Sequence, residues 1–197
     1  MRRRAAVGFG GAAALTLAAI AGVSATIDLV TARRLWAIQA TGYVAAFALT
    51  LSLLMSLLHR WRPRPALPTL RRSAGLTAAG LGAVHAALVR SLGYWTDPTE
   101  LITEPHLRAG ATALVVLGLL AVTSFPSTTR LLGKSWRSLH VAVYGAAAMV
   151  AHHILLSPVA DPTMSTCVAA LLGLIVAARL ALGARRQRAR RSAGAGV

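Results

Sequence analysis

Long apolar stretches alternate with short polar segments along nearly the whole chain. Each apolar stretch holds roughly 20 residues, the length that an α-helix needs to cross the hydrocarbon core of a bilayer. The pattern predicts an all-α membrane protein in which six transmembrane helices form one bundle, because only helices and closed barrels satisfy their backbone polar groups within lipid. The predicted spans are Ala5–Thr26, Trp36–Leu58, Ser73–Tyr94, Leu107–Phe125, Ser138–Leu156 and Met164–Leu182.

The first apolar stretch allows two interpretations. Three arginines at 2–4, an alanine-rich core and a Val-Ser-Ala sequence at 23–25 resemble a secretory signal peptide with its cleavage site. We interpret the stretch as a retained helix. Cleavage would leave five spans in the same orientation, so the rest of the prediction does not depend on this choice.

The composition agrees with a membrane protein. Apolar residues make up 56% of the chain and charged residues only 13%, about half of the usual ~25% for soluble domains. No internal repeat or low-complexity linker stands out, and no polar segment is long enough for a flavin- or nicotinamide-binding domain. We therefore predict one transmembrane domain over residues 1–197, with a core at 36–158 and a basic, disordered cytoplasmic tail at 184–197.

The positive charge is unevenly placed along the chain. In a soluble protein, the formal net charge of +16 and the pI near 12.0 would suggest a nucleic-acid partner. Here most basic residues lie at the two ends and in every second loop, whereas all five acidic residues lie in the other loops. This pattern predicts that both termini are cytoplasmic in a multi-pass protein of the bacterial inner membrane, with lipid and no nucleic acid as partner. The acidic residues are Asp28, Asp97, Glu100, Glu104 and Asp161.

The predicted spans contain histidines. They hold no Asp or Glu at depth, which excludes carboxylate relays and paired-carboxylate catalysis. Of the six histidines, His59 and His106 lie at span boundaries. The others lie within or at the edge of the apolar regions, where an ionisable side chain marks a functional site by default. These are His85, His140, His152 and His153.

Two of these histidines are predicted to face each other. The third and fifth spans run in the same direction, so the residue count from the start of each span gives a comparable depth. At 1.5 Å per residue, His85 lies roughly 18 Å above Ser73, and His153 lies roughly 23 Å above Ser138. Two neutral imidazoles that face each other from neighbouring helices are the axial ligands of a b-type haem. For each histidine taken alone, a hydrogen bond between helices is the alternative.

A second site is predicted below the first. His140 lies roughly 20 Å below His153 on the same span, which suggests two stacked sites across the bilayer. Arg90, beyond His85, either pairs with haem propionates or extends to water. A porphyrin also needs thin helix faces, although small residues also serve simple helix packing. The small residues around His85 are Gly75, Ala78, Ala79, Gly82 and Ala86.

These residues belong to a set of motifs that resembles a known family. The resemblance covers about Arg71 to His153. The motifs are Thr123-Ser124, Arg130-Leu131-Leu132-Gly133-Lys134, Trp136-Arg137-Ser138-Leu139-His140, Tyr144 and His153, with Arg71-Arg72, Gly75 and His85 upstream. Together they resemble the ferric reductase-like transmembrane family. Within that family they are most similar to the haem-binding membrane subunits of bacterial periplasmic methionine sulfoxide reductase systems.

The resemblance implies an electron-transfer subunit of an oxidoreductase system, with no catalytic residue of its own. It implies one or two b haems, with FMN as a further cofactor, that receive electrons from a cytoplasmic flavin reductase or quinol. The acceptor would be a periplasmic molybdenum oxidoreductase that reduces oxidised methionines. Two alternatives stay open, namely a stand-alone transmembrane ferric or small-molecule reductase and a haem-free membrane scaffold.

The resemblance also implies ligands for the haem irons. His85 and His153 match the ligands of the outer haem, and His140 matches a ligand of the inner one. His152 is the alternative to His153, and the family spacing of 13 residues after His140 favours His153.

The inner haem has no evident second ligand in this sequence. Arg71 stands where longer members of the family carry a histidine. His59, at the cytoplasmic end of the second span, is one alternative. Tyr144 would pack on the inner haem, whereas Gly82 and Arg90 would contact the outer one.

Overall fold

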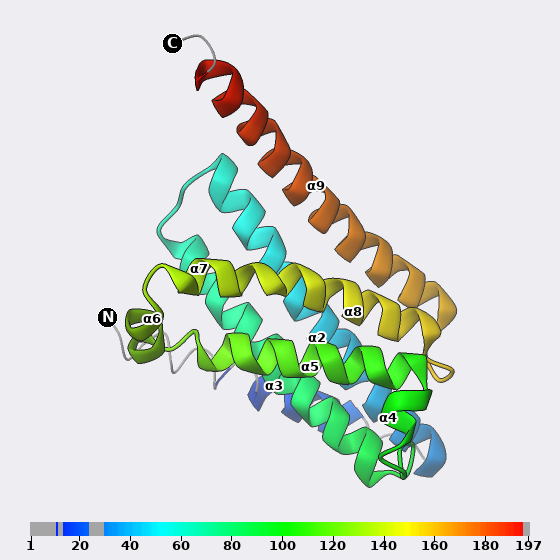
Figure 1. Cartoon of the computed structure of the whole chain (residues 1–197). Helices are drawn as coiled ribbons and strands as arrows, with labels where there is room; N and C mark the ends of the chain where they lie inside the picture. The colour runs from blue at the N-terminus through cyan, green and yellow to red at the C-terminus, as the bar shows by residue number, and fades with distance from the viewer. Residues whose placement is uncertain (1–10, 12–13, 24–29, 195–197) are drawn as a thin grey trace.

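The computed structural model describes residues 11, 14–23 and 30–194, and the regular structure within them is helical (Figure 1). The first predicted span, Ala5–Thr26, lies partly outside these residues, and its described part is the short apolar helix Ala14–Val23. The elements that follow are α2 (Val30–Trp61), α3 (Ala66–Ser91), α4 (Glu100–Thr103), α5 (Pro105–Val122), α6 (Pro126–Leu132), α7 (Ser135–Leu139), η1 (His140–Ala142), α8 (Val143–Leu156) and α9 (Pro162–Gly194).

Four of the described helices are both long and apolar enough to cross a membrane, where six spans were predicted. They are Ala32–Trp61 in α2, Pro105–Val122 in α5, Ser135–Leu156 in α7 to α8, and Pro162–Arg185 in α9. Helix α3 has 26 residues and therefore the length of a span. Its arginines at 71, 72 and 90 lower its mean hydropathy, so α3 is long enough to span a membrane but is not among the four helices that are also apolar enough. The chain is a multi-pass membrane protein.

The long helices pack into one bundle. Helix α2 packs along α3, α5 packs along α8, and α9 contacts both α8 and α2 (Figure 1). Small side chains let the helix backbones approach one another closely, which is the usual basis of helix packing in lipid; Ala78 of α3 and Ala146 of α8 are each only 1% exposed. The buried core consists of Ala48, Leu49, Leu53, Ala78, Ala79, Leu117, Ala146, Ala147, Leu172 and Ile175.

The bundle has two chemically different ends. At one end, the connection from α3 to α5 and the start of α9 lie beside α2, whose Tyr43 hydroxyl donates to the carbonyl of Asp161 at 3.2 Å. We call it the acidic end, because the described acidic residues lie there. They are Asp97, Glu100, Glu104 and Asp161. The opposite end holds the connections from α2 to α3 and from α5 to α8, which carry arginine and lysine, and we call it the basic end.

A turn at the basic end controls how the chain re-enters the bundle. Pro126 begins α6, and Gly133 follows its end with a φ of 51°, a conformation that glycine adopts without a Cβ clash. The chain returns through α7 and the 3₁₀ turn His140–Ala142 before α8 begins. His140 therefore lies at a 3₁₀ turn within Ser135–Leu156, a segment that is long and apolar enough to be the single span that the sequence predicted from Ser138 to Leu156.

Helix α9 is longer than the predicted sixth span. It continues to Gly194 and extends past the other helices at the basic end (Figure 1). The segment from residue 184, predicted as a disordered tail, is therefore helical as far as Gly194. Alanine and arginine are strong helix formers, which accounts for the extension.

Candidate functional site

The side chains of His85 on α3 and His153 on α8 face each other inside the bundle. Their ring centroids are 6.0 Å apart, and the ring planes meet at 78°. Metal–imidazole bonds are about 2.0–2.1 Å long, so two imidazoles on opposite sides of one metal have centroids roughly 6 Å apart. The two rings are therefore spaced as axial ligands of a shared metal ion would be.

Both imidazoles are held in the same way by the backbone of a neighbouring helix. His85 Nδ1 lies 3.0 Å from the carbonyl oxygen of Ile38 in α2, and His153 Nδ1 lies 2.7 Å from the carbonyl oxygen of His106 in α5. A carbonyl only accepts, so each Nδ1 carries the proton and donates it. In a neutral ring this leaves the lone pair on Nε2. A backbone carbonyl on the other ring nitrogen is the usual support of a metal-binding histidine.

A glycine makes room for each ring. A Cβ at Gly42 would lie 3.0 Å from Cε1 of His85, and a Cβ at Gly110 would lie 2.8 Å from Nδ1 of His153. Each glycine stands four residues after the residue whose carbonyl accepts the hydrogen bond, so both lie one turn apart on the same helix face. We call each carbonyl and its glycine an imidazole clamp.

The two imidazole clamps repeat along the chain. Each histidine lies 47 residues after its carbonyl partner. Every member of the second clamp lies 68 residues after its counterpart, from 38 to 106, from 42 to 110 and from 85 to 153. The pairs α2–α3 and α5–α8 therefore form two similar hairpins, although no internal repeat stands out in the sequence. The recurring glycine and histidine at one offset were the signal that could have revealed both clamps.

A cavity surrounds the paired imidazoles and reaches the acidic end, where Trp95, Val159 and Ala160 line it; we call it the upper cavity. Its empty volume, which includes open solvent, is about 1080 Å³. Its walls are mostly apolar and include the predicted thin face of α3. The lining residues on that face are Ala78, Gly82, His85 and Ala86.

The upper cavity fits a haem better than a bare metal ion. Within the described ranges, no three His, Cys, Asp or Glu side chains converge as a bare ion would require. A porphyrin supplies four nitrogens itself, so haem iron needs only axial ligands from the protein. Two clamped imidazoles with Nε2 lone pairs, in an apolar cavity, match that need.

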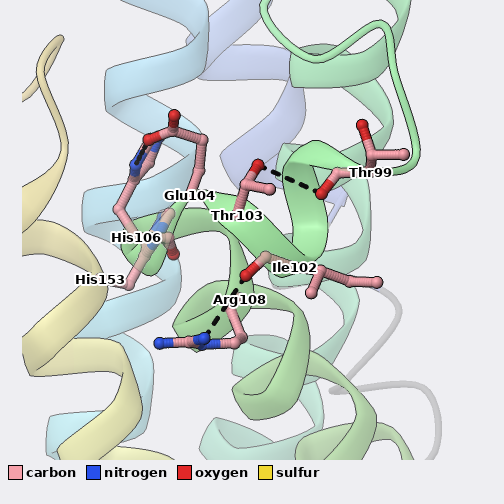
Figure 2. A network of polar contacts seen from close by, with 7 residues as sticks. All are labelled: Thr99, Ile102, Thr103, Glu104, His106, Arg108 and His153. Atoms are coloured by element: carbon pink, nitrogen blue, oxygen red, sulfur yellow. Dashed lines mark hydrogen bonds and ion pairs between the residues drawn. The ribbon is translucent and has the colours of Figure 1, made fainter.

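Above His153, the acidic end covers the site with a short polar network that the sequence analysis did not anticipate (Figure 2). The ring of His106 stacks on that of His153, with centroids 6.2 Å apart and planes at 19°. His106 Nδ1 lies 3.9 Å from the carboxylate of Glu104. In the neighbouring turn, the backbone N–H of Thr99 donates to the carboxylate of Asp97 at 2.9 Å. This hydrogen bond, and then one from the Thr99 side chain, holds the pKa of Asp97 below its usual range.

Arg90, predicted either to pair with haem propionates or to extend to water, is engaged with the adjacent loop. Its Nη1 donates to the carbonyl of Trp95 at 3.2 Å, and its guanidinium lies 5.8 Å from the centre of the Trp95 ring. Trp95 lines the upper cavity, whereas Arg90 does not. The assignment of Arg90 to the cofactor stays a prediction.

A second cavity, the lower cavity, lies at the basic end around His140. It has an empty volume of about 820 Å³. His140 Nε2 lies 3.3 Å from the Thr123 hydroxyl, and the Trp136 ring lies 4.1 Å from the His140 ring at 33°. The indole N–H of Trp136 donates to the carbonyl of Thr123 at 2.9 Å. The polar residues that line the lower cavity are Ser52, Arg71, Arg72, Ser124, Trp136 and His140.

Three other predicted residues lie away from both cavities. The Tyr144 hydroxyl accepts a hydrogen bond from Nε of Arg179 at 2.7 Å. His59 has a buried Nδ1 without a partner, and neither it nor Tyr144 lines a cavity. His152 is exposed, whereas His153 is the one that faces His85.

Comparison with known proteins identifies a family for most of this region. The family described as "Ferric reductase like transmembrane component" matches residues 41–152, which include Gly42, His85, Gly110 and His140 and stop one residue before His153. No solved structure matches the chain.

Individual relatives share one name, the protein-methionine-sulfoxide reductase heme-binding subunit MsrQ. The subunit of Rhodospirillum rubrum is 37% identical over 127 residues, covering 62% of this chain and 61% of the relative. The subunit of Bordetella pertussis is 31% identical over 58% of each chain. The subunit of Xanthomonas campestris is 32% identical over 161 residues, covering 78% of this chain and 73% of the relative. The chain thus spans about three fifths of the length of the first two relatives.

Proposed function

We propose that this chain, which belongs to the ferric reductase-like transmembrane family, is a haem-binding electron-transfer subunit of a methionine sulfoxide reductase system. The names of its relatives support this function. The single observation that carries it is the pair of clamped imidazoles 6.0 Å apart, each with Nδ1 on a backbone carbonyl.

The chain's own residues would hold and shield the cofactor. His85 and His153 would bind haem b through Nε2, and when bound the haem would supply a one-electron iron(III)/iron(II) couple. The imidazole clamps fix both rings before the cofactor arrives. The apolar walls of the upper cavity shield the ligand nitrogens from water.

Catalysis would belong to a partner. Converting a sulfoxide to a thioether consumes two electrons and two protons and releases water, so a one-electron carrier must deliver twice per sulfoxide. Among the described residues, the lining of the upper cavity contains no Asp, Glu or Cys. We assign the acceptor role to a periplasmic molybdenum oxidoreductase that docks at the acidic end.

The positive-inside rule supports the orientation of this path. Arginine and lysine concentrate at the basic end, which would face the cytoplasm, as would both termini, in the bacterial inner membrane. Electrons would enter there from a flavin reductase or quinol. His140 would then serve an inner haem in the lower cavity, and FMN would be a further cofactor.

An absorption spectrum of the detergent-purified protein, oxidised and dithionite-reduced, tests the proposal. We expect a b-haem spectrum that His85→Ala and His153→Ala each diminish by the signal of the upper haem. His152→Ala is the matched control, because that side chain is adjacent in sequence but exposed, and it should leave the spectrum unchanged. If all three variants keep the wild-type spectrum, the ligand assignment is wrong.

The same preparation separates the two alternatives. A colourless protein would favour the haem-free scaffold. Reoxidation of the reduced protein by a chelated ferric salt, at a rate that matches turnover and without any partner protein, would favour the stand-alone reductase. We expect a coloured protein that is reoxidised slowly until its partner is added.

A further inference from the structure

Arg179 of α9 is a half-buried cation with only part of its hydrogen bonds made. Its Nε donates to the Tyr144 hydroxyl at 2.7 Å. Its Nη1 is buried and has no hydrogen-bond partner. A guanidinium has five N–H donors and stays charged in proteins, so it cannot escape the situation by losing a proton. The unused donor points to a missing acceptor.

A second guanidinium makes the local charge less favourable. Arg71 of α3 lies close enough to interact electrostatically with both Tyr144 and Arg179. Two like charges in a low-dielectric environment repel, and a charge within a membrane bundle is expensive unless it is paired. Two half-buried arginines beside each other therefore require a negative group.

The described residues offer no such group nearby. Their carboxylates lie at the acidic end, and the nearest one on the same helix axis is Asp161, just before α9 begins. Arg179 lies 17 residues after Pro162, roughly 26 Å along the helix. A carboxylate at that distance cannot pair with Arg179, so the counter-charge must come from a bound molecule.

The lower cavity supplies a place for that molecule. Arg71 lines it together with Arg72 and His140, and the remaining walls are largely apolar. The Ser52 hydroxyl donates to the backbone carbonyl of Arg71 at 2.9 Å, which fixes the start of α3 at the cavity. Arg71 thus connects the cavity to Arg179. The apolar body of an occupant would pack against the apolar walls of the lower cavity, and its anionic group would pair with Arg71 and Arg179.

We propose that Arg71 and Arg179, together with the Tyr144 hydroxyl that Arg179 contacts, bind the oxyanion of an otherwise apolar molecule seated at the lower cavity. Guanidinium groups bind carboxylate and phosphate oxygens through paired hydrogen bonds. Tyr144 accepts from Arg179 and has its own proton to donate to the oxyanion. The oxyanion is either a propionate of a haem at His140, which rests on the proposed function, or the phosphate of an anionic phospholipid, which does not.

The sign of a stability change tests the site. Removing a buried charge that lacks a partner usually stabilises a protein, whereas removing one member of a buried pair destabilises it. Purified Arg179→Met and Arg71→Met should therefore unfold about 2–4 °C or more below the wild type. Arg108→Met is the control, because Arg108 is an exposed arginine at the acidic end whose guanidinium donates to the carbonyl of Ile102 at 3.4 Å, so its loss should leave the unfolding temperature unchanged. An unchanged or higher unfolding temperature for Arg179→Met would overturn the proposal.

Two further measurements identify the source of the oxyanion. In nanodiscs of phosphatidylcholine with or without one-third phosphatidylglycerol, a phospholipid at the site predicts that phosphatidylglycerol stabilises the wild type and not Arg179→Met. A haem propionate predicts that the destabilisation is the same in both lipids, disappears in haem-free protein, and comes with less haem per chain. A destabilisation independent of both lipid and haem would mean a purely structural role and would also overturn the proposal. A lipid-dependent result in colourless protein would uphold the oxyanion site while the proposed function fails.

Discussion

The upper and lower cavities lie in the same bundle, yet they present their histidines in opposite ways. In the upper cavity, backbone carbonyls occupy Nδ1 of His85 and His153 and leave both Nε2 atoms for a ligand. In the lower cavity, the hydroxyl of Thr123 contacts Nε2 of His140 itself. The upper site is thus prepared for a metal, whereas the lower one must exchange a contact before Nε2 can bind one.

The 68-residue repeat of the two hairpins also explains why the two cavities contain different side chains. Residues of the two hairpins correspond at an offset of 68, and by that offset the counterpart of His140 is Arg72. The upper cavity therefore receives a histidine from each hairpin. The lower cavity receives a histidine from one and an arginine from the other, so the same architecture gives a symmetric metal site at one end and a mixed cationic site at the other.

The largest expected effect comes from replacing a histidine in one cavity, which should remove the haem of that cavity and leave the haem of the other cavity bound. His153→Ala should remove the upper haem, and His140→Ala should remove only the lower one, because each side chain lies in a different cavity. The ratio of haem to chain, measured as the pyridine haemochrome, should fall in both variants, with different absorption bands lost. If His140→Ala keeps the wild-type ratio, the lower cavity holds no haem and the comparison becomes one between a haem site and an anion site.

Filling the imidazole clamps should have the next largest effect. An added Cβ would lie 2.8 Å from His153 in Gly110→Ala and 3.0 Å from His85 in Gly42→Ala. Overpacking of this kind costs about 1–3 kcal/mol, so the affinity for added haem should fall by roughly 10–100-fold, more for Gly110→Ala. A titration of haem into the haem-free protein measures this effect.

Other glycines in the same bundle provide the control. Gly118 and Gly145 have nothing within 4 Å of an added Cβ. Alanine at these positions should leave haem binding unchanged and should stabilise the helix by about 0.5–1 kcal/mol. If Gly110→Ala binds haem as tightly as Gly118→Ala does, the imidazole clamp does not position His153.

The imidazole clamps also show how far the candidate site could be predicted from the sequence. The span pattern and the depths of His85 and His153 follow from residue counts along helices, and the structure brings these two histidines together. The clamps could not be predicted that way, because they depend on which backbone carbonyl of a neighbouring helix each ring reaches. Tyr144 and Arg90 show the same limit: their positions were predictable, but their partners, Arg179 and Trp95, depend on side-chain direction.

A smaller effect should distinguish the two cavities through Thr123. Thr123→Val removes the hydroxyl that contacts His140, which should destabilise the protein by about 1 kcal/mol and change only the lower-site spectrum. Thr112→Val is the matched control, because the hydroxyls of Thr123 and Thr112 both donate at 2.8 Å to a carbonyl of their own helix. A spectrum that changes equally in both variants would mean that the Thr123–His140 contact has no specific role.

The smallest expected effect is a pH dependence at the mouth of the upper cavity. The backbone N–H of Thr99 keeps the pKa of Asp97 below its ordinary value of about 3.9. A lowered folded-state pKa contributes stability above that ordinary value, and the contribution is lost as the pH falls through the folded-state value. Trp95 lines the upper cavity, and its indole N–H donates to the carbonyl of Asp97 at 2.8 Å. Acid should therefore loosen this turn and affect the upper-site spectrum before the lower one.

The Asp97 side chain offers its own control for this effect. Asp97→Asn keeps an oxygen for the Thr99 N–H but has no carboxyl group to titrate, whereas Asp97→Ala removes the acceptor at every pH. The difference in unfolding temperature between the wild type and Asp97→Ala should therefore shrink from pH 5 to pH 3, while the difference between the two variants should stay constant. If acid perturbs the lower-site spectrum first, the acidic end does not control the upper cavity, and protonation at the basic end is the cause.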